Sequence, residues 1–215
     1  EDVTTLSPLQ HGMIFHSLYA AEGGDYVVQV SLTFSDDLDL KIYQEAWQQV
    51  VDHHTILRTS FIWEGLEEPH QVVRKQVKIT MDHQDLRGLA KEEQEKVIAA
   101  YLQEDRVRSF DLTQPPLMRW TVFHLQDQGQ RAYKIVWSFH HALLDGWSMP
   151  LVFKDWLTAY TDLLKGNTAQ LESRRPYRDY IAWLKRQDLQ EAERFWREQL
   201  RGFDTPTPLG IGKVD

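Results

Sequence analysis

Two adjacent histidines, closely followed by an aspartate and a glycine, form the stretch of this sequence best suited to chemistry. His140 and His141 end an apolar run over residues 133–139, and Asp145 and Gly146 follow within five residues. An imidazole exchanges a proton near neutral pH, and a nearby carboxylate either orients that imidazole or anchors a loop. Glycine leaves space for a backbone or a slender substrate. The stretch therefore indicates a histidine-dependent site at the end of a strand.

The two histidines are predicted to perform different tasks. Side chains alternate between the two faces of a strand, so consecutive residues point in opposite directions. One face would carry Tyr133, Ile135, Trp137, Phe139 and His141, and the other Lys134, Val136, Ser138 and His140. One histidine is therefore a candidate for chemistry, and the other is a candidate for holding the loop in place.

Other interpretations compete with an acid–base role. A histidine pair at a strand end often serves only as a hydrogen-bonded structural feature. A metal site lacks a visible third ligand, and the second pair, His53 and His54, lies at a helix end where cations complement the helix dipole. A nucleophilic serine is poorly supported because Ser138 and Ser148 lack a Gly-x-Ser-x-Gly motif. The remaining chemical interpretation is a histidine acting on a nucleophile carried by the substrate, which is acyl transfer without a covalent enzyme intermediate.

Composition narrows the class of protein. The 215 residues are 42% hydrophobic and include no cysteine, which leaves no thiolate nucleophile, disulfide or cysteine-based zinc site. A formal net charge of −8 without any lysine or arginine cluster argues against nucleic acid and against a polybasic membrane contact. No apolar run approaches the length of a membrane span. We expect a globular, cytoplasmic protein and, because the first residue is Glu1 rather than Met, a piece of a longer polypeptide.

Periodicity predicts a mixture of helices and strands. Ser7, Pro8 and Gln10 form a capping-box pattern that starts the first helix. The period of apolar residues predicts helices over residues 8–21, 39–54, 90–110, 150–164, 178–186 and 189–200. Alternating residues predict strands over 25–34, 57–63, 70–75, 77–81, 116–126 and 131–140, the last two joined as a hairpin. The segment 204–215 is rich in proline and glycine and is predicted to be a linker.

The final helices and one charged stretch are interpreted as structural. Five aromatic residues recur there at near-helical spacing, which is typical of a core: Tyr177, Tyr180, Trp183, Phe195 and Trp196. The charged run over residues 91–96 is most simply a solvated helix face, with docking of a carrier protein as the alternative.

The histidine stretch carries a family resemblance. HHALLDG, residues 140–146, resembles the HHxxxDG signature of condensation domains of nonribosomal peptide synthetases, within the chloramphenicol acetyltransferase-like superfamily. Three further segments resemble motifs of that family in the same order: LSPLQHGMIFHSL, HHTILRTSF and YRDYIAWL. Motifs of the family's second lobe have no counterpart. The chain is therefore similar to the N-terminal lobe alone.

The resemblance implies a fold and a domain division. The expected fold is α/β (α+β), a chloramphenicol acetyltransferase-like lobe in which a mixed β-sheet packs against helices. Residues 1–203 would form the N-terminal lobe, and residues 204–215 would lead toward a C-terminal lobe that completes the domain. The active histidine would lie near the cleft between the two lobes.

The resemblance also implies an activity and residue roles. Amide formation would join a donor peptidyl or aminoacyl thioester to the amine of an acceptor aminoacyl thioester, with His141 as the catalytic residue. His140 would hold the loop, Asp145 would be structural and paired with Arg58, and Gly146 would leave room for the donor arm. The chain itself would bind no cofactor or metal. Phosphopantetheine arms would arrive on donor and acceptor carrier proteins, with an adenylation domain as a neighbour.

Details of the motifs narrow the subtype. Heterocyclising relatives replace the leading histidine with aspartate, whereas both histidines are present here. The segments PLQHGMIFH and LDGWS resemble the subtype that accepts a donor ending in a D-residue and an L-aminoacyl acceptor. His54 departs from the family's usual glutamate. Two alternatives remain: a non-catalytic lobe that binds carriers or substrate, and a stand-alone acyltransferase acting on a free small molecule.

Overall fold

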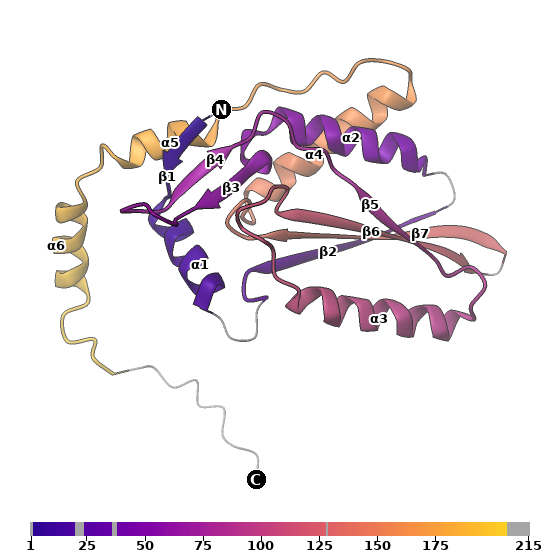
Figure 1. The fold of residues 1–215 in the computed structure, drawn as a ribbon, viewed down its shortest axis with the longest axis horizontal. Helices are drawn as coiled ribbons and strands as arrows, with labels where there is room; N and C mark the ends of the chain where they lie inside the picture. Colours follow the sequence, from indigo (N-terminus) through magenta and orange to yellow (C-terminus); the bar gives the residue numbers. More distant parts are fainter. Residues whose placement is uncertain (1, 20–23, 36–37, 128, 206–215) are drawn as a thin grey trace, which may run out of the picture. The chain divides into compact units, whose positions relative to one another are not determined.

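The protein is described by a computed structural model that covers residues 2–19, 24–35, 38–127 and 129–205 (Figure 1). The chain divides into two compact units, residues 1–181 and residues 182–215. Helices together with one mixed and one antiparallel sheet confirm the predicted α/β class. Of the predicted linker, residues 206–215 lie outside the described residues. None of the helices in the described part of the chain is long and apolar enough to cross a membrane.

A four-stranded sheet forms the centre of the first unit. Its order is β2 (Val27–Ser35), β7 (Gln130–His140), β6 (Met118–Asp127) and β5 (Met81–Asp85). The β6–β7 pair is the predicted antiparallel hairpin, whereas β5 runs parallel to β6. The chain therefore brings His140 to the end of a central strand.

Helices cover both faces of this sheet (Figure 1). On one face lie α2 (Leu40–His53) and α4 (Ser148–Leu164), and on the other lies α3 (Lys91–Val107). Trp137 of β7 packs on Trp47 of α2 with their rings 4.7 Å apart. The side chains of β7 alternate as predicted. Ile135, Trp137 and Phe139 pack in the hydrophobic core that includes α2 and α4, whereas Val136 packs in a smaller core with residues of α3.

A second, three-stranded sheet carries the start of the chain. It has the order β1 (Asp2–Thr5), β4 (His70–Val73) and β3 (Thr59–Ile62), with a short 3-10 helix, η1 (Thr55–Arg58), leading into β3. The first helix, α1 (Pro8–Tyr19), follows β1. Strand β1 was not predicted, because its four residues carry no clear alternation.

The strand predicted over residues 77–81 is wrong. Val77 and Ile79 are buried, but this extended segment does not pair with a strand. Instead, the Gln48 side chain of α2 donates to the Val77 carbonyl at 2.9 Å and accepts from the Ile79 N–H at 3.0 Å. A side chain thus takes the place of a neighbouring strand, and pairing begins only at Met81, with Trp120.

The aromatic residues of the last helices are not core residues in the described structure. These helices are α5 (Tyr177–Leu184), which crosses the boundary between the two units, and α6 (Leu189–Gln199). Trp183, Phe195 and Trp196 are about half exposed, and α6 buries none of its side chains. The helical positions were predicted correctly but their burial was not, because helical period identifies an apolar face without identifying what covers it. The charged run over residues 91–96 is exposed as predicted, apart from buried Gln94.

Candidate active site around His141

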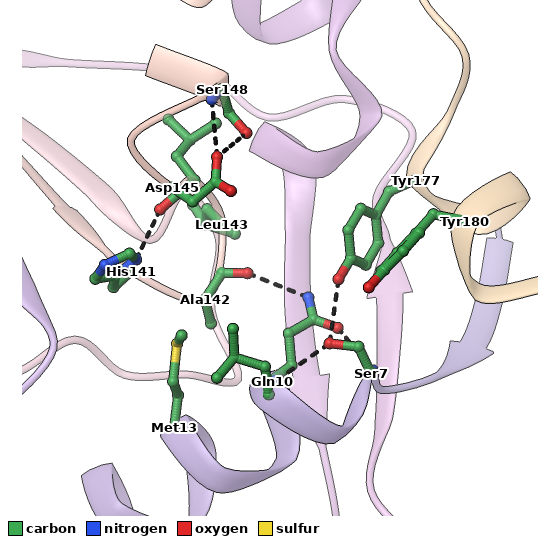
Figure 2. Close-up of a pocket in the computed structure, with 12 residues that line it drawn as sticks. Ser7, Gln10, Met13, His141, Ala142, Leu143, Asp145, Ser148, Tyr177 and Tyr180 are labelled. Carbon is green, nitrogen blue, oxygen red and sulfur yellow. Dashed lines mark hydrogen bonds between the residues drawn. The ribbon is translucent and has the colours of Figure 1, made fainter. Parts of the chain in front are cut away.

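The predicted capping box at the start of α1 is present. The Ser7 hydroxyl accepts a hydrogen bond from the Gln10 N–H at 3.2 Å, and the Gln10 side-chain oxygen accepts one from the Ser7 N–H at 3.0 Å. These reciprocal bonds satisfy two backbone donors at the helix start. The helix is thereby fixed beside the loop that follows β7, where Gln10 and Met13 of α1 line the same cavity as His141 (Figure 2).

His140 is a buried structural histidine. Its Nδ1 accepts a hydrogen bond from the Ala142 N–H at 3.1 Å, and its Nε2 lies 3.0 Å from the Ser17 hydroxyl. That hydroxyl donates its own proton to the Met13 carbonyl, so His140 donates from Nε2. Burial, together with the neighbouring His141, lowers the pKa of His140 to about 4. His140 is therefore a neutral imidazole with both ring nitrogens hydrogen-bonded, and its loop-holding role stays a prediction.

His141, the first residue after β7, lines a cavity of about 400 Å³ (Figure 2). Its Nδ1 is 2.8 Å from the Leu144 carbonyl oxygen, which can only accept, so a neutral His141 carries its proton on Nδ1. Nε2 is then an unprotonated acceptor, and it has no hydrogen-bond partner among the residues that the structure describes. The geometry leaves one imidazole nitrogen available to a substrate.

The expected ion pair between Asp145 and Arg58 is wrong. Arg58 donates instead to backbone carbonyls, including those of Val51 at 3.2 Å and Lys75 at 3.0 Å. One carboxylate oxygen of Asp145 accepts from the N–H groups of Trp147 and Ser148 and from the Ser148 hydroxyl. Asp145 therefore closes the loop onto the start of α4. Its partners are backbone N–H groups and the Ser148 hydroxyl rather than a cation.

Gly146 faces open space. A Cβ atom added there would meet no heavy atom within 4 Å, and its φ is not in the left-handed region. Backbone strain therefore does not demand glycine at this position. The free space is compatible with the room predicted for a donor arm.

Neither serine of this region is arranged as a nucleophile for His141. Ser138 donates to Asp105 at 2.5 Å, and Ser148 donates to Asp145 at 2.5 Å. Both hydroxyl protons are thus committed to carboxylates. Among the described residues, the geometry supports acid–base or orienting chemistry at His141 and not a serine triad.

A second cavity, of about 340 Å³, shares Leu143 and Leu144 of the histidine loop as walls. Beside it, His54 Nε2 lies 2.9 Å from Asp155 Oδ2, and Arg174 donates to Asp155 Oδ1 at 3.0 Å. Burial acts to raise the pKa of Asp155, but the bonds from Arg174 and His54 outweigh it and leave that pKa below its usual value. Burial also lowers the pKa of His54, so this histidine is not the dipole-complementing cation that the sequence suggested.

The same cluster is the nearest approach to a metal site among the described residues. Donor atoms of His53, His54 and Asp155 lie within 4.8 Å of one another. However, Arg174 already supplies positive charge to the carboxylate, and His54 donates its Nε2 proton to the other oxygen. The cluster acts as a tie between α2, α4 and the segment before α5, and no metal is needed to neutralise it.

Sequence reasoning missed three residues that build the His141 cavity. Gln10 was recognised as a helix cap, but its side-chain amide also donates to the Ala142 carbonyl at 3.1 Å. Tyr177 and Tyr180 line the cavity, and the Tyr177 hydroxyl donates to Ser7 Oγ at 3.2 Å. The available signals were one glutamine and two tyrosines inside two of the four motifs, but no spacing rule brings segments so far apart together.

The fold and site together define an α/β lobe with a histidine-centred cavity at a strand end. Comparison with known proteins shows the family to which the chain belongs. The sequence matches the Condensation domain family over residues 1–210. It is 56% identical over 212 residues to one of the linear gramicidin synthase proteins of Brevibacillus parabrevis, covering 99% of this chain and 3% of that protein. It is 36% identical to gramicidin S synthase 2 of Brevibacillus brevis, covering 97% of this chain and 5% of that protein.

Solved structures show the same fold. A mutant of the starter condensation domain of rhizomide synthetase superposes with a TM-score of 0.79 at 19% identity, covering 96% of this chain and 50% of that one. The first condensation domain of the calcium-dependent antibiotic synthetase, in complex with a substrate analogue, gives 0.79 at 19% identity, with 97% and 50% covered. The chain thus spans about half of these structures and a small part of the synthetases. It belongs to the condensation-domain family of nonribosomal peptide synthetases and has the chloramphenicol acetyltransferase-like fold.

Proposed function

We propose that this chain is the N-terminal lobe of a condensation domain that forms peptide bonds between two carrier-bound substrates. The family match and the synthetase relatives support this reaction class. The observation that carries the proposal is the state of His141, which lines the cavity with its Nδ1 held by the Leu144 carbonyl and its Nε2 without a hydrogen-bond partner among the described residues.

In this reaction the acceptor amine attacks the donor thioester carbonyl, the C–N bond forms, and the C–S bond breaks. The amine loses a proton and the departing sulfur gains one. A typical α-amino group has a pKa of about 7.7 to 8.0, so part of it is already neutral near pH 7. His141 Nε2 accepts a hydrogen bond from that amine, orients its lone pair toward the carbonyl and accepts the proton released on attack.

The proposal includes partners. Donor and acceptor carrier proteins supply the thioesters on phosphopantetheine arms, a C-terminal lobe completes the cleft, and an adenylation domain is a neighbour. The motif wording PLQHGMIFH favours a donor ending in a D-residue and an L-aminoacyl acceptor. Because half of the solved condensation domains lies beyond the part that this chain matches, we expect the chain alone to be inactive in peptide transfer. The cytoplasmic location expected from the sequence is part of the same proposal.

The test uses a complete condensation domain that contains this chain, supplied with loaded donor and acceptor carriers. Peptide transfer is followed by intact-protein mass spectrometry for wild type, His141→Ala and His83→Ala. General acid–base groups contribute about a hundredfold or more, so His141→Ala should lose at least that much transfer while remaining folded. His83 lies on the edge strand β5 and contacts His124, so its replacement is a matched histidine control and should be neutral. Transfer near the wild-type rate in folded His141→Ala would contradict the proposal.

A further inference from the structure

Ala142, the residue that follows His141, is hydrogen-bonded at both of its backbone polar atoms. The Ala142 N–H donates to His140 Nδ1 at 3.1 Å, and the Ala142 carbonyl accepts from Gln10 Nε2 at 3.1 Å. Both partners are almost completely buried, with 3% of each residue exposed. Figure 2 shows the bond from Gln10 reaching across to the loop. The N–H and the carbonyl of Ala142 are therefore each hydrogen-bonded to a buried side chain.

The Gln10 amide is itself fixed in orientation. Its Oε1 accepts from the Ser7 N–H at 3.0 Å, and Gln71 Nε2 approaches the same oxygen at 3.5 Å. With the oxygen facing donors, the amide NH2 must face the Ala142 carbonyl, which can only accept. Ser7 is in turn bonded by the Tyr177 hydroxyl. Hydrogen bonds thus fix the start of α1, and Gln10 connects it to the loop that follows β7.

We propose that Gln10 is a positioning residue for His141, acting through the Ala142 carbonyl. The inference rests on the proposed function, because that proposal makes the His141 imidazole the group that binds the acceptor amine. The Nδ1 bond of His141 closes a turn that ends at the Leu144 carbonyl, and Ala142 lies inside that turn. Releasing the Ala142 carbonyl lets the turn shift, which loosens the bond that keeps the proton on Nδ1 and Nε2 free.

Gln10→Met in the complete condensation domain removes the amide and keeps the length and volume of the side chain. Gln94→Met is the matched control, because Gln94 is also buried and donates to two backbone carbonyls, those of Leu89 and Gln126. Met118 of β6 pairs with Phe139, the residue before the two histidines. Gln126 lies eight residues further along β6, which places it about 26 Å along the strand from Met118. The two variants lose similar buried hydrogen bonds in different places.

Two readouts separate positioning from general stability. The first is the His141 tautomer, measured by long-range proton–nitrogen NMR on histidine-labelled protein and assigned with His141→Ala. The second is steady-state peptide transfer. In Gln10→Met we expect a mixture of tautomers and a kcat about ten- to a hundredfold lower, with KM for the acceptor changed less than about threefold. Gln94→Met should retain the Nδ1–H tautomer and a kcat within about twofold of wild type.

The outcomes distinguish this inference from the proposed function. An unchanged tautomer in folded Gln10→Met would overturn the positioning role, whatever happened to turnover. A mixture of His141 tautomers with unchanged turnover would support the positioning role of Gln10 and contradict the catalytic role of His141. Equal losses in Gln10→Met and Gln94→Met would also overturn the inference, because the effect would then be general destabilisation.

Gln10→Glu provides a second test should Gln10→Met not fold. The introduced carboxyl keeps the acceptor for the Ser7 N–H, and burial raises its pKa. When protonated it donates to the Ala142 carbonyl, and when ionised it repels that oxygen. Turnover relative to wild type should therefore fall as pH rises through the pKa of the introduced carboxyl. A ratio that does not change with pH would overturn the inference.

Discussion

Arg174 neutralises a carboxylate that is almost completely buried, so removing it should destabilise the fold strongly. Asp155 is 2% exposed, whereas the Arg174 side chain is 25% exposed. Arg174→Met leaves a buried charge with only the imidazole of His54 beside it. Breaking such a pair typically costs 3 to 5 kcal/mol, and because Arg174 is partly solvated we expect the lower end, about 3 kcal/mol at pH 8. For a chain of this size that corresponds to a fall in Tm of about 6 to 12 °C.

The cost of Arg174→Met should depend on pH. In the wild type, burial holds the pKa of His54 below its unfolded value of about 6.5, so the His54 contribution to stability falls as pH drops through that value. Without Arg174, a protonated His54 pairs with Asp155, and its folded pKa moves above the unfolded one. That contribution is fully present below about pH 6.5 and is lost as pH rises through the folded pKa. The difference between variant and wild type should therefore shrink from about pH 8 to about pH 5.5.

Urea unfolding followed by tryptophan fluorescence measures both quantities. Arg178→Met is the matched control, because Arg178 pairs with Asp2 at the same 3.0 Å but both side chains are more exposed, at 59% and 33%. An exposed pair contributes about 0 to 1 kcal/mol. The double variant Asp155→Leu/Arg174→Met should recover most of the loss, since it leaves no stranded charge. A loss below about 1 kcal/mol at pH 8, or one independent of pH, would refute this account of the cluster.

Three further predictions concern the histidine loop. Asp145→Ala should cost only about 1 kcal/mol in urea unfolding, because it removes bonds to exposed helix-start groups and not a buried ion pair; a loss of about 3 kcal/mol or more would restore the idea of a buried pair. In an NMR titration the His140 ring should stay neutral until the pH approaches its pKa of about 4, and titration near pH 6.5 would mean that it is not buried as described. Gly146→Trp should fold normally, since the position is open, while transfer in the complete domain is blocked; unchanged transfer would remove the donor arm from this position.

Local patterns predicted most of the secondary structure because each pattern has a local physical cause. The capping box at Ser7 and Gln10 is a four-residue arrangement, and it formed as expected. The alternation along β7 follows from strand geometry, but the strand ends at His140, so this alternation does not extend to His141 in the loop that follows. The segment 77–81 failed because its backbone partner is a glutamine side chain of α2, which no periodicity within the segment could indicate.

The partners of charged residues were the least predictable part of the site. The motifs suggest a pair between Asp145 and Arg58, but a carboxylate followed closely by free N–H groups at a helix start already has local donors, and it uses them. The carboxylate that does need a cation is Asp155, one of two acidic residues in α4 and the one facing the interior. Which turn of a helix faces inward depends on packing against α2, and this cannot be deduced from the motif.

The stability of the histidine loop and its chemistry depend on different contacts. Asp145 and His140 satisfy backbone groups of the loop itself, whereas Gln10 reaches it from a helix 132 residues earlier in the chain. Local bonds can form whenever the loop does, but the bond from Gln10 requires α1 to be docked on the end of β7. The placement of His141 is therefore coupled to the packing of α1. A substitution in α1 can change turnover while the local hydrogen bonds of His140 and Asp145 stay intact.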